Sequence, residues 1–325
     1  IPNDPAYSSQ CSMESVKANL AWDYWDIING QLPTNDKILL VSVDTGVDYT
    51  HSDLIGNIWI NQGEIPEWLF ELPDLDDGDG MLTATEIASF MQNQTNSMGE
   101  NYDFRDALRE ISPFTDGIDN DGNGYVDDIL GWDTSGESGI QDNDPFPNTG
   151  NGILNSGGWA HGTHVAGILG ATTDNGIGMS STAFDLKIMS VKASREDGDD
   201  INEPMIDNGY EGILYAAHTG FLHGYNTVIN ASWGRDGIGT SEKALLDQAF
   251  IYGAIIVAAA GNGNEDGNDE SYEFHYPASD ENVVSVCALQ CNGVWGGWAT
   301  YHESVDLAAP GDNIYSTIMG GGYQS

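Results

Sequence analysis

Residues 38–46 read Ile-Leu-Leu-Val-Ser-Val-Asp-Thr-Gly, an apolar run that ends in an acidic residue and a glycine. A hydrophobic run of this length indicates a strand that is buried on both faces, as in a parallel sheet. Asp44 then lies at the carboxyl end of the strand, where the catalytic and ligand-binding groups of open α/β sheets gather. The segment therefore predicts a buried parallel strand. Taken alone, its Asp-Thr-Gly is either a functional carboxylate or the ordinary end of a strand, since Asp and Gly end many strands.

The same kind of apolar run recurs along the chain, at 186–191, 227–231, 254–260 and 283–288. Helical patterns alternate with these runs, at 161–172, 206–224 and 241–253. Strands that alternate with helices predict a three-layer αβα fold, in which helices cover both faces of a mostly parallel central sheet.

The chain is strongly acidic, with 51 Asp and Glu against 9 Lys and Arg and a formal net charge of -42. Nucleic acid needs a basic surface and is excluded as a partner. Bound divalent cations, or adaptation to a halophilic or marine medium in which salt screens the repulsion, would each explain such acidity. No run of about 18 apolar residues occurs, so we expect no membrane-spanning segment.

Residues 62–150 interrupt the alternation of strands and helices within a single expected domain that spans 1–325. They contain 21 acidic residues against two basic ones, Arg105 and Arg109, and are rich in Gly, Asn and Pro. We expect this acidic insertion to lack a core of its own unless bound cations help it to fold.

Cys287 and Cys291 are close enough in sequence to close a small loop after an apolar strand. A bridge between them is predicted, with two buried thiols as the alternative, and it suits an oxidising compartment. Cys11 is then free or paired outside this chain. The chain starts at Ile1 without a signal-peptide pattern, which is typical of a processed, secreted product.

Residues 161–167 read His-Gly-Thr-His-Val-Ala-Gly and open a predicted helix. A helix start can project the His161 imidazole into a cleft, and Gly162 lets a substrate chain approach closely. Taken alone, the two histidines could equally bind a metal or lie in the core.

Together, several motifs in a fixed order make the chain resemble the subtilisin-like serine proteases, or subtilases. These are 43–46 (VDTG), 51–54 (HSDL), 161–167 (HGTHVAG), 230–234 (NASWG), 258–262 (AAAGN) and 308–311 (AAPG). The resemblance covers the chain from its first residues to its last and is interrupted by the acidic insertion. It implies a secreted endopeptidase whose substrates are proteins or peptides.

The resemblance also implies roles for single residues. Asp44 would orient His161, which would act as the general base. Asn262 matches the asparagine that donates a hydrogen bond to the oxyanion. Ser232, Trp233 and Gly234 match the strand that pairs with extended substrate backbone.

The nucleophilic serine of the family follows the AAPG segment in a Gly-Thr-Ser-Met-Ala type motif, which does not occur before Ser325. We therefore expect a chain truncated before its nucleophile and inactive alone, with its own cleaved C-terminal segment as a candidate partner. The alternative is a catalytically silent, calcium-dependent module that binds peptides. Residues 239–241 spell Gly-Thr-Ser but precede Asn262, and Ser241 is better interpreted as a helix N-cap.

Calcium is the expected cofactor, and the insertion holds two candidate loops. Residues 119–128 (DNDGNGYVDD) place oxygen ligands at alternate positions as in a calcium loop, although Leu130 stands where an EF-hand has its bidentate glutamate. Residues 74–86 resemble an EF-hand with one extra residue. The expected ligands are Asp119, Asp121, Asn123, the Tyr125 carbonyl and Asp127 or Asp128 in the first loop, and Asp77, Asp79 and Glu86 in the second.

A third calcium site follows only from the family resemblance, which implies ligands between the segment after the catalytic Asp and a loop after the His helix. The residues at the corresponding positions are Asp4, Asp53, Thr173, Asn175, Ile177 and Met179.

Overall fold

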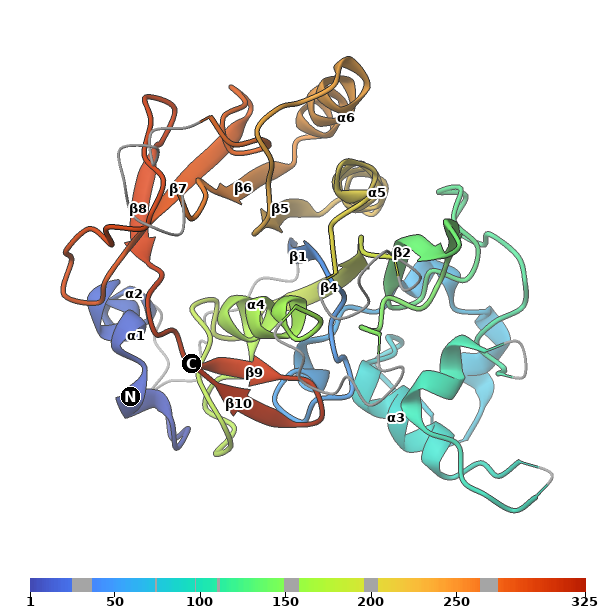
Figure 1. Cartoon of the computed structure of the whole chain (residues 1–325). Coiled ribbons are helices and arrows are strands. Elements are labelled where there is room, and N and C mark those ends of the chain that lie inside the picture. Colours follow the sequence, from blue (N-terminus) through green and yellow to red (C-terminus); the bar gives the residue numbers. More distant parts are fainter. Residues whose placement is uncertain are drawn as a thin grey trace.

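The computed structural model describes residues 1–24, 37–73, 75–96, 98–109, 112–148, 158–195, 204–263 and 274–325. Within them, eight strands form one sheet in the order β3-β2-β4-β1-β5-β6-β7-β8 (Figure 1). Neighbouring strands from β2 to β8 are parallel, and β3 pairs antiparallel with β2 at one edge. The predicted α/β fold with a mostly parallel sheet is confirmed.

Each of the five apolar runs forms a strand of this sheet. They are β1 (Ile38–Asp44), β4 (Lys187–Lys192), β5 (Asn226–Ala231), β6 (Ile255–Ala259) and β7 (Val283–Leu289). The remaining strands had no apolar signal: β2 (Gly131–Glu137), β3 (Ile140–Asp142) and β8 (Leu307–Pro310), together with the separate hairpin of β9 (Ser316–Ile318) and β10 (Gly322–Gln324).

The three helices predicted from the pattern are present as α4 (His161–Gly170), α5 (Gly209–Leu222) and α6 (Thr240–Ile251). The prediction of Ser241 as a helix cap was wrong: the N-cap of α6 is Gly239, whose N–H donates to the Glu242 carboxylate at 2.6 Å. The described residues also form three shorter α-helices, α1 (Cys11–Ser15), α2 (Ala18–Trp22) and α3 (Ala84–Gln92). They contain 3-10 helices at Tyr7–Ser9, Ile55–Asn57, Gln62–Glu64, Glu67–Glu71 and Phe104–Leu108. In the described parts of the chain, no helix is both long and apolar enough to cross a membrane.

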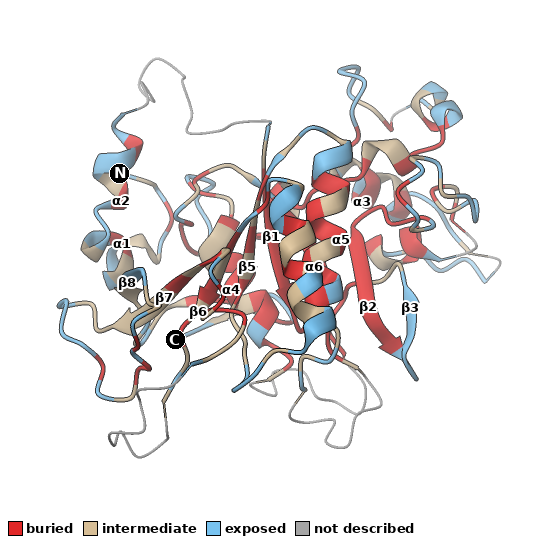
Figure 2. Cartoon of the chain, turned by 90° about the horizontal axis from the view of Figure 1, so that it is seen from above, coloured by how far each residue is buried: buried red, intermediate tan, exposed pale blue. Residues whose placement is uncertain are grey.

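Alternation along β1 divides the interior into two cores. Leu39, Val41 and Val43 point to the side covered by α5 and α6, and Leu40 points to the side of α4. Figure 2 shows the central strands of the sheet buried between these layers, while β3 and the outer surface of α6 are exposed. Burial on both faces explains why the central strands are almost wholly apolar.

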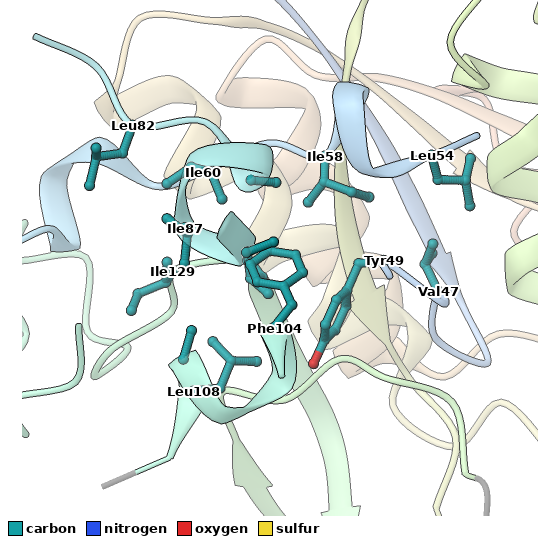
Figure 3. Close-up of a cluster of buried hydrophobic side chains, with 14 of the residues drawn as sticks. Val47, Tyr49, Leu54, Ile58, Ile60, Leu82, Ile87, Phe104, Leu108 and Ile129 are labelled. Atoms are coloured by element: carbon teal, nitrogen blue, oxygen red, sulfur yellow. The ribbon is translucent and has the colours of Figure 1, made fainter. Parts of the chain in front are cut away.

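The acidic insertion shares the core on the α4 side. Figure 3 shows its apolar side chains, among them Leu82, Ile87 and Phe104, beside Ile58 and Tyr49 of the segment that follows β1. Scattered apolar residues of the insertion pack into one cluster with the rest of the domain, so the insertion shares this core rather than forming one of its own. Its last part, β2 and β3, belongs to the central sheet.

A buried ion pair fastens β2 to β4. Lys192 Nζ lies 2.8 Å from Asp133 Oδ2, and both side chains are only 2% exposed. Asp133 also accepts hydrogen bonds from the N–H groups of Ser135 and Gly136, so its charge is paired and solvated within the fold. A strand built from such paired polar groups carries no hydrophobic pattern.

The predicted bridge between Cys287 and Cys291 was wrong. Cys291 is bonded to Cys11, across a sequence separation of 280 residues, and Cys287 is a free thiol on β7. Proximity in sequence suggested the shorter loop, but the packing of α1 near the loop after β7 brings Cys11 within a Cα–Cα distance of 5.8 Å.

Candidate active site and metal-binding loops

Asp44 and His161 meet at the carboxyl edge of the sheet. Asp44 ends β1 and is 1% exposed, whereas His161 is the first residue of α4 and its side chain is 45% exposed. Asp44 Oδ1 lies 2.8 Å from His161 Nδ1 and also accepts the Thr45 N–H at 2.7 Å. The negative charge of Asp44 raises the pKa of the His161 imidazole, and burial of the imidazole acts in the opposite direction. This geometry selects the tautomer with Nδ1 protonated and leaves Nε2 as the basic nitrogen.

The close approach of α4 to β1 depends on Gly162. A Cβ at this position would lie 2.3 Å from the Gly46 carbonyl oxygen and 3.1 Å from the Asp44 Cβ. The Gly162 N–H donates to the Thr45 hydroxyl at 3.0 Å, which fixes the start of the helix against the strand end. The glycine after His161 is therefore needed for packing of the pair.

The side chains of His164 and His161 have different hydrogen-bond partners. Its Nε2 lies 3.2 Å from the Gln324 carbonyl oxygen, and burial lowers its pKa. The two histidines of the motif thus contact different parts of the structure. Their use as a metal-binding pair is not supported by this arrangement.

The predicted substrate residues line one groove of about 700 Å³, which lies between the ends of β5 and β6 and the start of α5. Ser232, Trp233 and Gly234 form one wall, and Asn262 lies in the same groove with its side chain exposed. Trp233 is anchored because its indole N–H donates to the Val43 carbonyl at 2.8 Å and its ring packs edge-on against Tyr210.

In the first candidate calcium loop, the carboxylates of Asp119 and Asp121 converge with that of Glu64. Their ligand atoms lie within 4.8 Å of one another, and Glu64 is fully buried. Burial raises the pKa of Glu64 to about 7. Crowded carboxylates with little solvent are the donor set that a hard divalent cation prefers, so these residues fit calcium.

The other expected ligands of this loop lie around the cluster in different roles. Asn123 donates to Asp121 at 3.2 Å and to Asp128 at 2.9 Å. Asp128 is buried, accepts the Tyr215 hydroxyl at 2.6 Å, and has a pKa that burial raises to about 8. Asp127 turns away and accepts the N–H groups of residues 116 and 117, while the Tyr125 ring packs on Tyr215.

In the second loop, the cluster consists of Asp76, Asp77 and Asp79, whose ligand atoms also lie within 4.8 Å of one another. Glu86 accepts the Asp77 N–H at 2.9 Å and caps the start of α3 through Thr83. Asp76 thus joins two of the expected ligands, whereas the neighbouring Leu75 is buried in the core. Asp74, the first residue of the expected loop, lies outside the described residues.

Hydrogen bonds link several of the residues expected at the third calcium site. Asp4 accepts the N–H groups of residues 174–176, and Asp53 accepts the Asn175 side-chain amide at 2.8 Å and the Met179 N–H at 2.9 Å. Thr173 bonds to Ser181. Ile177 is partly exposed and donates its N–H to the Asn175 side chain.

Sequence reasoning missed three residues of these sites. Glu64 lies 55 residues before Asp119 and belongs to no local motif. Asp76 was not among the expected ligands of the second loop, and His275, which lines the groove with Gly234, follows no motif that we recognised. A buried glutamate becomes informative only when its neighbours in space are known.

An Asp–His pair and a groove lie at the carboxyl edge of a mostly parallel sheet, which is where open α/β proteins gather their functional groups. Residues 35–325 match the sequence profile described as the Subtilase family. The chain belongs to the subtilase family.

Similar proteins carry protease names. The chain is 29% identical to the extracellular basic protease of Dichelobacter nodosus, over 98% of this chain and 42% of that protein. It is 36% identical to thermitase of Thermoactinomyces vulgaris, over 61% of this chain and 60% of thermitase. Halolysin of Haloferax mediterranei is 27% identical over 97% of this chain and 41% of halolysin. The chain thus spans about two fifths to three fifths of these relatives.

Among solved structures, the S41 psychrophilic protease matches with a TM-score of 0.54 and 21% identity, over 88% of this chain and 70% of that one. This likeness supports the fold.

Proposed function

We propose that this chain is the catalytic domain, in large part, of a secreted subtilisin-like serine endopeptidase. The observation that carries the proposal is the 2.8 Å contact between buried Asp44 and exposed His161 at the carboxyl edge of the sheet. Family membership and the protease names of the relatives support it. Residues 1–325 form one domain in this proposal, with 62–150 as an insertion.

The chemistry follows from the geometry. Asp44 holds the His161 Nδ1–H, so that Nε2 takes the proton of a serine hydroxyl as its oxygen forms a bond to the peptide carbonyl carbon. The Asn262 amide donates to the resulting oxyanion. His161 then gives the proton to the leaving amine as the C–N bond breaks, and water releases the acyl group by the reverse sequence.

The substrate is an extended segment of a protein or peptide. Ser232, Trp233 and Gly234 pair with its main chain as an added β-strand, a mode that gives affinity through backbone hydrogen bonds. The nucleophilic serine is supplied by a segment beyond Ser325, whether continuous with this chain or cleaved and held by contact.

Calcium supports the fold in this proposal. Glu64, Asp119 and Asp121 would hold one ion, and Asp76, Asp77 and Asp79 a second, with the other expected ligands completing each shell. Each ion would neutralise a group of crowded carboxylates, of which Glu64 is buried. Asp4, Asp53 and Asn175 are the side chains available to a third ion. The remaining negative charge suits a salty medium.

The test is to label the complete protein with a fluorophosphonate, which reacts with an activated serine, and to measure casein hydrolysis in parallel. We expect labelling of one serine outside residues 1–325, lost in His161→Ala. This chain alone should bind peptide without labelling. A complete protein that binds peptide but is never labelled would instead be a catalytically silent module.

A further inference from the structure

Gly234 and Gly261 both line the groove, and we call the space between them the slot. Gly234 ends the substrate-binding wall after β5, and Gly261 precedes Asn262 after β6. Neither residue has a side chain, so the space between them would be open to a substrate side chain. Because Asn262 marks the position of the reacting carbonyl in the proposed function, this slot receives the side chain of the residue that supplies that carbonyl.

His275 occupies this slot. A Cβ on Gly234 would lie 2.4 Å from His275 Cδ2 and 2.8 Å from its Nε2, which places the ring edge directly against the Gly234 backbone. A Cβ on Gly261 would lie 3.4 Å from His275 Cγ. One imidazole therefore reaches both walls, and only 23% of its side chain is exposed.

The backbone holds His275 in place from both sides. Its N–H donates to the Ser279 hydroxyl at 2.8 Å, and its carbonyl accepts the Ser279 N–H at 2.7 Å. The next residue, Tyr276, exchanges two backbone hydrogen bonds with Arg235, at 2.9 and 2.8 Å. These bonds fix the backbone of His275 beside the substrate-binding wall.

We propose that His275 makes the slot shallow, so that the protein selects a small side chain, such as that of Ala or Ser, at the residue whose carbonyl is attacked. The proposal rests on the proposed protease function, because that function places the peptide in the groove. It assigns to His275 a steric role that does not depend on the charge of its ring or on the nearby Asp236 carboxylate.

Binding to this chain tests the proposal without a nucleophile. The peptides Ala-Ala-Pro-Ala and Ala-Ala-Pro-Phe, with free C-terminal carboxylates, are titrated by calorimetry or by tryptophan fluorescence. We expect the alanine peptide to bind at least about tenfold more tightly, a ratio typical of pockets that discriminate by size. Equal binding of the two peptides, or tighter binding of the phenylalanine peptide, would overturn the proposal.

Two variants separate size from chemistry. His275→Gly opens the slot and should remove or reverse the preference for alanine, while His275→Gln keeps most of the bulk and should retain it. Near-UV circular dichroism checks that each variant is folded. If His275→Gly does not fold, the ratio of the affinities of the wild-type chain for the two peptides decides the question. An unchanged ratio in folded His275→Gly would refute the steric role. Failure of the complete protein to label with fluorophosphonate would contradict the proposed function and leave this binding result intact.

Discussion

Asp44 Oδ1 lies 2.8 Å from His161 Nδ1, with the carboxylate buried and the imidazole half exposed. The carboxylate therefore lies on the buried side of the imidazole, and the other side of the ring is open to solvent. The carboxylate interacts with one ring nitrogen only, and the other remains available to a substrate. The charge of Asp44 raises the pKa of His161 above its ordinary value of 6.5.

Replacing Asp44 by Asn should lower the pKa of His161, because the favourable charge is lost while the burial that opposes protonation remains. Proton uptake by Nε2 needs the neutral ring, so activity of the complete protein should rise with pH through the raised pKa. The stability contributed by the charged pair is fully present below the ordinary pKa of 6.5 and is lost as pH rises through the raised pKa of the folded state. NMR titration of His161 measures the shift. Asp247→Asn, an equal charge change on the surface of α6, should leave it unaltered.

Gly162→Ala should destabilise the protein, although alanine is normally the better helix former by about 1 kcal/mol. The new Cβ would lie 2.3 Å from the Gly46 carbonyl oxygen, and relief of this clash must move α4 away from β1. We expect a loss of about 1–3 kcal/mol in the free energy of unfolding. Urea denaturation measures it. Gly237→Ala is the matched control, since a Cβ there meets no atom within 4 Å, and equal effects of both variants would contradict the packing argument.

Calcium removal by a chelator should lower the melting temperature, because an ion bound only to the folded state stabilises it by about 2.7 kcal/mol at one hundred times its Kd. Glu64→Gln should abolish part of this effect through the first loop, and Asp77→Asn another part through the second. Calorimetric melting with and without chelator measures each share. An unchanged melting temperature of the wild type on chelation would show the calcium proposal to be wrong.

Loss of the Cys11–Cys291 bond should cost about 2–5 kcal/mol, because the bond closes a loop of 280 residues and restricts the unfolded chain. Chemical denaturation of Cys11→Ser measures the loss. Cys287→Ser removes the free thiol on β7 and should change stability little. A large effect of Cys287→Ser with none for Cys11→Ser would instead favour the shorter bridge.

Periodicity predicted the central strands and helices correctly because those elements are buried on one or both faces and carry an unbroken apolar signal. It missed β2, since that strand is held by paired polar groups such as Asp133 and Lys192. It also missed the shared core of the insertion, where single apolar residues far apart in sequence meet in one cluster.

The sequence by itself predicted the αβα fold, the subtilase family and the pairing of Asp44 with His161, because contiguous motifs or a regular hydrophobic period indicate each of them. Only the tertiary structure decided that Glu64 meets Asp119 and Asp121, that Cys291 pairs with Cys11, and that His275 lies between Gly234 and Gly261. These contacts join residues brought together by the crossing of strands and loops. No local pattern records such a distance, because packing of the whole domain sets it.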